Sequence, residues 1–269
     1  MFARRIWGLV AAVAVISLLP MSLHAQGSDA SGSTPKNTAK AKAPTDFTGQ
    51  WISVVSEDWR YRMILPKKGD FGGVPVSSAG RKMANSWDPS KDEAAGEQCR
   101  SYGAAGVMRI PGRIRISWAD AETLKIETEA GTQTRLFYFK DPKTSGGDWQ
   151  GRSQATWETR NTRAGTGGPN FGGGGGEIVN RTIALSGGLD VVTTNLKPGY
   201  LRKNGVPYSD KTVLTEYYDR TEEPNGDSWL VVQTIVDDPV YLDEQFITSS
   251  HFKKQNDQSG WNPTPCSSR

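Results

Sequence analysis

Two charged residues lie where they could take part in chemistry, on stretches in which polar and apolar side chains alternate. Glu216 has the same parity as Leu214 and Tyr218, so its carboxyl group is expected to point with them into an apolar interior. A solvated outer face is the alternative. Arg135 shares a face with Phe137, which places its guanidinium in a ligand pocket or beside an acid such as Glu216. If the protein is an enzyme, Glu216 and Arg135 are the catalytic candidates, because burial raises carboxyl pKa values toward the range of acid–base catalysis.

Other catalytic arrangements have less support. After a leader is removed, His251 is the one histidine, and without Cys-x-x-Cys or His-x-x-x-His spacing we predict no zinc or copper site. The acidic pairs at 237–238 and 243–244 match no calcium loop and are expected to be solvated, although a calcium site stays open. The chain lacks Gly-x-Ser-x-Gly, and His251 is expected to be a partly buried structural imidazole. The five glycines ending at Gly176 lack the Lys-Ser/Thr of a phosphate-binding loop, so no cofactor is predicted.

The elements that carry these residues are expected to be mostly strands. From Val107 onward apolar and polar residues alternate in short stretches, which is typical of antiparallel sheet with one solvated face. A first strand is expected at Phe47 to Ser56, one convincing helix at Ser77 to Trp87, and a weak helical turn at Lys91 to Cys99. Four stretches rich in β-branched and aromatic residues predict a β-meander: Leu189 to Leu196, Val213 to Asp219, Trp229 to Val236 and Gln245 to Phe252.

Together these elements predict an all-β fold. The expected architecture is a single antiparallel up-and-down β-barrel or strongly curved sheet of roughly eight to ten strands, lipocalin-like, with one short peripheral helix. A β-sandwich is the alternative. Successive hairpins need no long crossover, and closure removes exposed sheet edges, so the barrel is favoured. This domain is expected over residues 46–269, with a Gly-rich surface insertion at about 160–176.

The N-terminus indicates export. Met1–Ala25 has two early arginines, an apolar run over Ile6 to Leu19 and a small-residue cleavage site near Ala25, which is the pattern of a bacterial secretory signal. The apolar run is shorter than the roughly 20 residues of a spanning helix, so no stable membrane insertion is expected. The mature protein is therefore expected to be periplasmic or secreted, with residues 26–45 as a disordered tether.

The net charge of the mature chain bears on whether it binds polyanionic partners. Loss of the two leader arginines from a total of 32 basic residues leaves 30, against 29 acidic residues. This near neutrality gives no support for binding to nucleic acid or to an anionic membrane.

The two cysteines, Cys99 and Cys266, predict a disulfide. An exported chain reaches an oxidising compartment, where two cysteines are an obvious pair. The bridge is expected to hold the tail from Gly260 to Pro265 across the barrel, because that tail has no strand pattern.

Aromatic and charged residues concentrate at Glu57 to Arg62. The favoured interpretation is a strand that buries Trp59 and Tyr61 while Arg60 and Arg62 point outward, and a pocket-lining role is the alternative. The candidates for lining a ligand pocket are Trp59, Arg62, Gln133, Arg135, Tyr200 and Tyr241.

A resemblance to known proteins rests on a few segments. Pro198 to Pro207 and Asp237 to Leu242 resemble a large family of secreted, β-rich bacterial proteins of unassigned function. The resemblance extends through Glu57 to Arg60 and Glu97 to Cys99, and so covers most of the mature chain. It implies export and a β-rich fold, and no activity.

Two function classes follow. The first is an exported binding protein or accessory factor that holds a small, partly apolar molecule in the barrel. The second is a cofactor-free periplasmic hydrolase, lyase or isomerase that uses Glu216 with a tyrosine or arginine in acid–base chemistry. The first is favoured, because barrels of this size enclose ligand cavities more often than catalytic pairs.

Overall fold

The computed structural model describes residues 37–142, 146–160 and 186–268. The predicted signal peptide, the first part of the predicted tether and all but the first residue of the Gly-rich insertion lie outside these residues. No helix in the described ranges is both long and apolar enough to cross a membrane.

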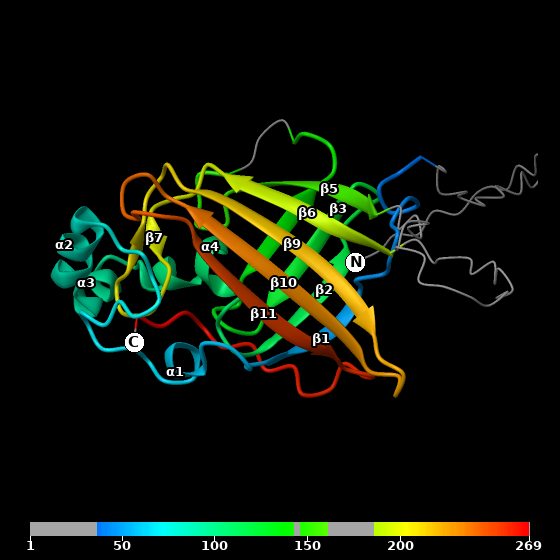
Figure 1. Ribbon diagram of the computed structural model, residues 1–269, viewed down its shortest axis with the longest axis horizontal. Helices are drawn as coiled ribbons and strands as arrows, with labels where there is room; N and C mark the ends of the chain where they lie inside the picture. Colours follow the sequence, from blue (N-terminus) through cyan, green and yellow to red (C-terminus); the bar gives the residue numbers. More distant parts are fainter. Residues whose placement is uncertain (1–36, 143–145, 161–185, 269) are drawn as a thin grey trace, which may run out of the picture. The chain divides into compact units, whose positions relative to one another are not determined.

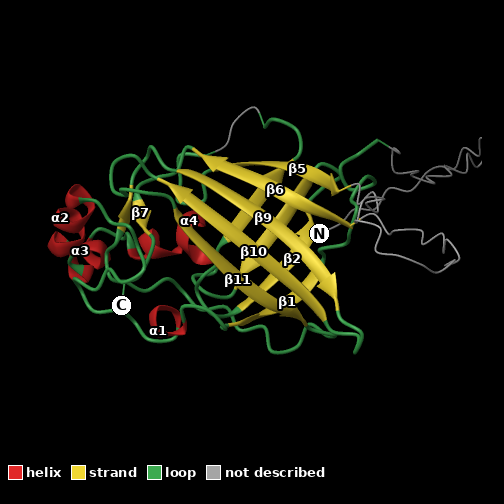
Figure 2. Cartoon of the chain, in the orientation of Figure 1, coloured by secondary structure: helices red, strands yellow, loops and turns green. Residues whose placement is uncertain are grey.

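Nine strands close into a barrel in the described part of the chain (Figures 1 and 2). The first strand pairs with both the last strand and the second, and this double pairing closes the barrel. The predicted β-barrel is confirmed, and the predicted meander corresponds to β6, β9, β10 and β11. In order around the barrel, the strands are β1 (Gly49–Val54), β11 (Phe246–Lys254), β10 (Ser228–Asp237), β9 (Val213–Glu222), β6 (Ser186–Thr194), β5 (Arg152–Arg160), β4 (Thr134–Tyr138), β3 (Thr123–Thr128) and β2 (Arg113–Trp118).

The expectation of a purely antiparallel sheet is wrong at one pair. β4 and β5 run parallel, with Phe137 opposite Ser153. A parallel pair needs a crossover of about a dozen residues or more, and the described parts of this connection are residues 139–142 and 146–151. The backbone of Asp148 and Trp149 in this crossover accepts hydrogen bonds from Lys197 and Ala104, which lie outside the barrel strands. The chain therefore returns to the end where β4 began before it enters β5.

The interior of the barrel is filled by side chains of one parity. On β10, Leu230 and Val232 are fully buried, whereas Gln233, the residue after Val232, is exposed. The same alternation continues on the other strands, and burying each large apolar side chain contributes about 1.5 to 3 kcal/mol. Trp51, Ile126, Phe137, Val191, Tyr218 and Phe252 belong to this core.

One end of the barrel is covered by short helices (Figure 1). The single expected helix is confirmed as α2 (Ser78–Ser86), whose cap Ser77 accepts a hydrogen bond from the backbone of Gly80. The weak helical turn expected at Lys91 to Cys99 is present as parts of α3 (Pro89–Ala94) and η1 (Gln98–Tyr102), but the expectation of a single peripheral helix is wrong, because local turns in the connections also close helical hydrogen bonds. The further elements at this end are α1 (Trp59–Arg62), α4 (Ala104–Val107), β7 (Gly199–Tyr200) and β8 (Pro207–Tyr208).

A second apolar cluster joins this cap to the barrel. Val206 and Tyr208 of the β7–β8 region pack with Val76 and with two strand residues, Leu214 and Val236. All five are buried. The cap is therefore part of the folded body and gives fixed positions to the side chains above the barrel mouth.

The tether predicted over residues 26–45 is wrong for its last part. Thr38 and Ala39 are buried. The Ala39 N–H donates to Glu122 on the β2–β3 turn, and the indole of Trp157 donates to the Ala39 carbonyl at 2.8 Å. These contacts offset the entropy lost when residues 38 and 39 become ordered. The composition alone had suggested that nothing would offset that loss.

The C-terminal tail runs back along the outside of the barrel to the helical end (Figure 1). The Gln255 N–H donates to the Gln50 carbonyl, and the Asn262 N–H donates to Glu129 at 2.6 Å. The tail ends at the predicted Cys99–Cys266 disulfide, which is confirmed with the two Cα atoms 5.0 Å apart.

Asp238, which the sequence assigns to a solvated turn, is 2% exposed. Its carboxylate accepts hydrogen bonds from the Thr212 hydroxyl at 2.6 Å and from the Val240 and Tyr241 N–H groups, each at 2.8 Å. The Ser209 N–H is a further donor. Burial raises the pKa of Asp238, and these hydrogen bonds outweigh it and lower that pKa below its ordinary value.

Replacing this carboxylate is expected to destabilise the fold. Asp238→Ala should cost about 3 kcal/mol in urea unfolding near neutral pH, because it leaves several buried donors unpaired. The exposed neighbour provides the matched control, and Asp237→Ala should change stability by less than about 0.5 kcal/mol.

The contribution of Asp238 also has a defined pH dependence. A carboxyl group with a depressed folded-state pKa stabilises above its unfolded pKa of about 3.9 and loses that contribution as pH falls through the folded value. The difference between the protein and Asp238→Ala should therefore shrink below about pH 4. Equal effects of the two alanine variants at pH 7 would contradict this role.

Candidate functional site

The predicted pair of Glu216 and Arg135 lies inside the barrel. Both side chains are 0% exposed, so the expectation that both face the interior is confirmed. Arg135 on β4 donates from Nη1 to Glu216 Oε1 at 2.8 Å and from Nη2 to Oε2 at 2.5 Å. This is the two-pronged geometry in which a guanidinium binds a carboxylate most strongly.

Neighbouring polar groups complete the pair. The Tyr218 hydroxyl donates to Glu216 Oε1 at 3.2 Å, and Thr193 Oγ1 lies 3.5 Å from Arg135 Nη2. Burial lowers the pKa of Arg135, and the Glu216 carboxylate outweighs burial and raises it. Burial and then the Glu216 charge raise the pKa of Tyr218, so this hydroxyl stays protonated and donates. The cluster is suited to holding β4 and β9 together.

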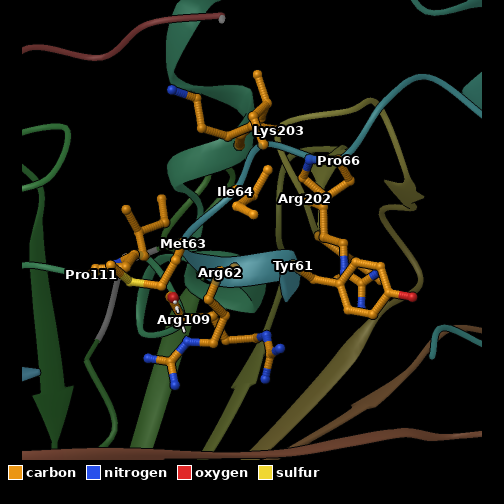
Figure 3. Close-up of a pocket in the computed structure, with 14 residues that line it drawn as sticks. Tyr61, Arg62, Met63, Ile64, Pro66, Arg109, Pro111, Arg202 and Lys203 are labelled. Carbon is orange, nitrogen blue, oxygen red and sulfur yellow. Dashed lines mark hydrogen bonds between the residues drawn. The ribbon is translucent and has the colours of Figure 1, made fainter. Parts of the chain in front are cut away.

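A cavity of about 270 Å³ lies at the helical end of the barrel (Figure 3). One wall is apolar and comes from the segment after β1, in which Met63, Ile64 and Leu65 are exposed. Arg135 and Glu216 are not among its lining residues. The full lining is Tyr61 to Pro66, Ser101, Gly106, Arg109 to Pro111, and Leu201 to Lys203.

In the segment Glu57 to Arg62, the favoured prediction is right for Arg60, which is exposed, and wrong for Trp59 and Arg62. Residues 59–62 form a helical turn, α1, that follows Asp58 in a left-handed conformation with φ of 52°. Trp59 is therefore 60% exposed, while the side chain of Arg62 is 1% exposed and lines the cavity. The alternative, that this segment lines a pocket, is confirmed for Arg62.

Three buried arginines contribute to the cavity. Arg62 donates from Nε to the Arg109 carbonyl at 2.9 Å and from Nη1 to Glu57 at 3.3 Å. Arg109 donates from Nη2 to Asp58 at 2.8 Å. Arg202 donates from Nη1 to the Gly72 carbonyl at 2.6 Å, and its guanidinium lies 4.4 Å from the ring centre of Tyr61.

The six predicted ligand-lining residues do not form one site, and Arg62 alone among them lines this cavity. The Gln133 amide lies beside the disulfide, 3.4 Å from the Cys266 sulfur, and Arg135 is in the barrel core. The Tyr200 hydroxyl donates to Asp92 at 3.2 Å, and the Tyr241 carbonyl accepts from Ser77 at the start of α2. Gln133, Tyr200 and Tyr241 therefore hold parts of the cap together. Trp59 points away into solvent.

The sequence did not point to most of the residues that make the cavity. Arg109 follows the apolar Val107–Met108 pair without a motif, and Met63 to Pro66 precede a stretch rich in Gly and Pro. Arg202 and Lys203 lie in the segment that carries the family resemblance, which is the one signal that singled them out.

A second cavity of about 630 Å³ lies at the opposite end. Its wall includes Phe47, Trp118 and Trp157, and the ring centres of Phe139 and Trp157 are 4.6 Å apart. Its charged lining residues, Lys40 and Asp46, are exposed, so it offers no buried charge for recognition.

His251 does not complete a hydrolase triad. Ser56 Oγ and Glu57 Oε2 lie 2.8 Å and 3.3 Å from the same ring nitrogen, Nδ1. A triad needs the nucleophile and the acid at opposite nitrogens of the imidazole. Across residues 37–142, 146–160 and 186–268, no three His, Cys, Asp or Glu side chains are grouped to hold a metal ion.

Comparison with known proteins adds no assignment. No protein-family model matches this chain. No curated protein and no solved structure matches it either. The resemblance to secreted bacterial proteins therefore stays a prediction.

Proposed function

We propose that this protein is an exported binding or accessory protein that holds a small, partly apolar molecule in the cavity at the helical end of the barrel. The observation that carries the proposal is the apolar wall, where Met63, Ile64 and Leu65 leave large apolar side chains exposed at one concave site. Apolar surface of this kind marks binding sites, because covering it with a ligand removes it from water.

The site proposed is the mouth of the barrel, as in a lipocalin-like architecture, and no longer its interior. Core side chains such as Trp51, Phe137 and Phe252 occupy the interior. A cavity of about 270 Å³ corresponds to roughly nine water molecules of liquid volume, which limits the enclosed part of a ligand to on the order of ten non-hydrogen atoms.

The enzyme alternative has weaker support. Catalysis by Glu216 requires a substrate within about 3 Å of its carboxylate. Both of its oxygens are occupied by Arg135, and Glu216 lines neither of the two cavities described above. We therefore assign the pair a structural role in this proposal.

Binding of a neutral apolar probe tests the proposal. We expect 1-octanol to bind saturably in a calorimetric titration and Ile64→Ala to weaken that binding about tenfold, which corresponds to about 1.4 kcal/mol of lost apolar contact. Ile247→Ala is the matched control, because Ile247 is 55% exposed against 58% for Ile64 but lies on β11 and does not line the cavity. Absence of saturable octanol binding, or equal losses in both variants, would overturn the proposal.

A further inference from the structure

The cavity has more buried positive charge than negative charge. Arg62 pairs with Glu57 at 3.3 Å, and Arg109 pairs with Asp58 at 2.8 Å. Arg202 is also buried, yet within the described residues it forms no ion pair, and the charges of Asp58 and Asp70 act on it from beyond ion-pair distance. Three arginines thus face two paired carboxylates, an excess of one positive charge.

The hydrogen-bonding capacity of these arginines is also incompletely used. Arg62 Nη2, Arg109 Nη1, and Arg202 Nε and Nη2 are buried and have no hydrogen-bond acceptor among the described residues. A buried charged donor without an acceptor costs more than a neutral one, for which the penalty is about 1 to 3 kcal/mol. Native proteins rarely leave such groups unpaired without a bound partner or a functional reason.

Arg109 is the common neighbour of the other two arginines, because its charge acts on both Arg62 and Arg202. The Arg109 and Arg202 groups lie 5.6 Å and 5.8 Å from the ring centre of Phe246, at the barrel mouth. Arg62 and Arg109 extend to the same side of α1, and Arg202 reaches the ring of Tyr61 (Figure 3). Burial lowers the pKa of Arg62, and the charge of Arg109 lowers it further. The same two causes lower the pKa of Arg202 to about 10.

We propose that the ligand of this cavity carries one acidic group, a carboxylate or phosphate head, that is held by Arg62, Arg109 and Arg202 while its apolar part covers Met63 to Leu65. This inference rests on the proposed function and specifies the chemical class of its ligand as a small amphipathic anion. One negative charge balances the excess, and its oxygens supply the missing acceptors.

Ligands of one chain length separate the acidic head from the apolar tail. Octanoate is expected to bind at least tenfold more tightly than 1-octanol, and this preference should fall as salt rises from about 0.05 to 0.5 M. Octyl phosphate and inorganic phosphate share the acidic group and differ in the apolar tail, so the pair shows whether the acidic group binds only together with a tail. Inorganic phosphate alone is expected not to bind. Both comparisons use the unaltered protein, so they decide the question even where a variant fails to fold.

A variant then tests which residues hold the acid. Arg202→Met keeps an unbranched apolar stem and removes the unpaired charge, so the preference for octanoate over octanol, taken as the ratio of the two affinities in the same variant, should disappear. Arg60→Met is the control, since Arg60 lies on α1 beside Arg62 but its own side chain is 66% exposed and does not line the cavity.

The outcomes separate this inference from the function on which it rests. Equal affinity for octanoate and octanol would overturn the anion site and leave the binding function standing. Binding of neither would overturn both. An octanoate preference that survives Arg202→Met and falls in Arg60→Met would overturn the assignment of the arginines.

Discussion

Glu216→Gln is expected to destabilise the protein by about 3 to 5 kcal/mol, which is the usual cost of leaving one member of a buried ion pair without its partner. Glutamine keeps the shape of the side chain but leaves the charge of Arg135, which is 0% exposed, without compensation. A further contact is weakened as well, because the Tyr218 hydroxyl then donates to a neutral amide oxygen and not to a carboxylate. Urea unfolding measures the loss, and the melting temperature should fall by at least about 6 °C.

A double variant separates the cost of an unpaired charge from the value of the pair. Glu216→Leu with Arg135→Met removes both charges, and apolar replacement of a buried pair is often neutral or stabilising. We therefore expect the double variant to be more stable than Glu216→Gln. Glu127→Gln is the single-site control, because Glu127 is 39% exposed in its pair with Lys125 and should cost under about 1 kcal/mol. A loss below about 1 kcal/mol in Glu216→Gln would show that water reaches the pair.

Removal of the Cys99–Cys266 disulfide is the second change with a large expected effect. The bridge closes a loop of 167 residues, for which the chain-entropy model gives up to about 5 kcal/mol of stabilisation. We expect Cys99→Ser with Cys266→Ser to lose about 3 to 5 kcal/mol in denaturant unfolding, chiefly because the unfolded chain gains freedom. The folded tail keeps other contacts, such as the hydrogen bond from Asn262 to Glu129.

Two measurements check that the loss arises in this way. Octanol binding by the double-serine variant should equal that of the unaltered protein at low denaturant, since neither cysteine lines the cavity. Ser267→Ala, next to the bridge, is the local control and should change stability by less than about 0.5 kcal/mol. Two alkylatable thiols in the non-reduced protein, or a loss below about 1 kcal/mol, would contradict a stabilising disulfide.

The alternation along single strands could be read from the sequence because it is a local property. Side chains point to opposite faces with a period of two, so the shared parity of Glu216, Leu214 and Tyr218 holds wherever the strand is placed. This is why the four-stranded meander and the inward position of Glu216 and Arg135 were predicted, while their pairing was one of two alternatives left open for Arg135. The disulfide was predicted for a different reason, which is that an exported chain with two cysteines leaves one possible pair.

The features that the sequence missed depend on contacts between distant segments. The parallel β4–β5 pair arises because the connection between the two strands is held by backbone groups of Ala104 and Lys197, and no local pattern encodes that return. Likewise, Glu57 to Arg62 alternates like a strand, but the chain turns at Asp58 and forms α1. The alternation then gave the wrong faces, with Trp59 outside and Arg62 inside.

The cavity is the clearest case of this dependence. Its walls come from residues 61–66, 106–111 and 201–203, which meet because the cap folds over the barrel mouth. Arg62 was a candidate from the sequence, but nothing there grouped it with Arg109 and Arg202, because most arginines are solvated surface residues. Their burial and their shortage of carboxylate partners emerge when these three segments come together. The charge balance of a site is a sum over neighbours in space, and a sequence specifies neighbours along the chain.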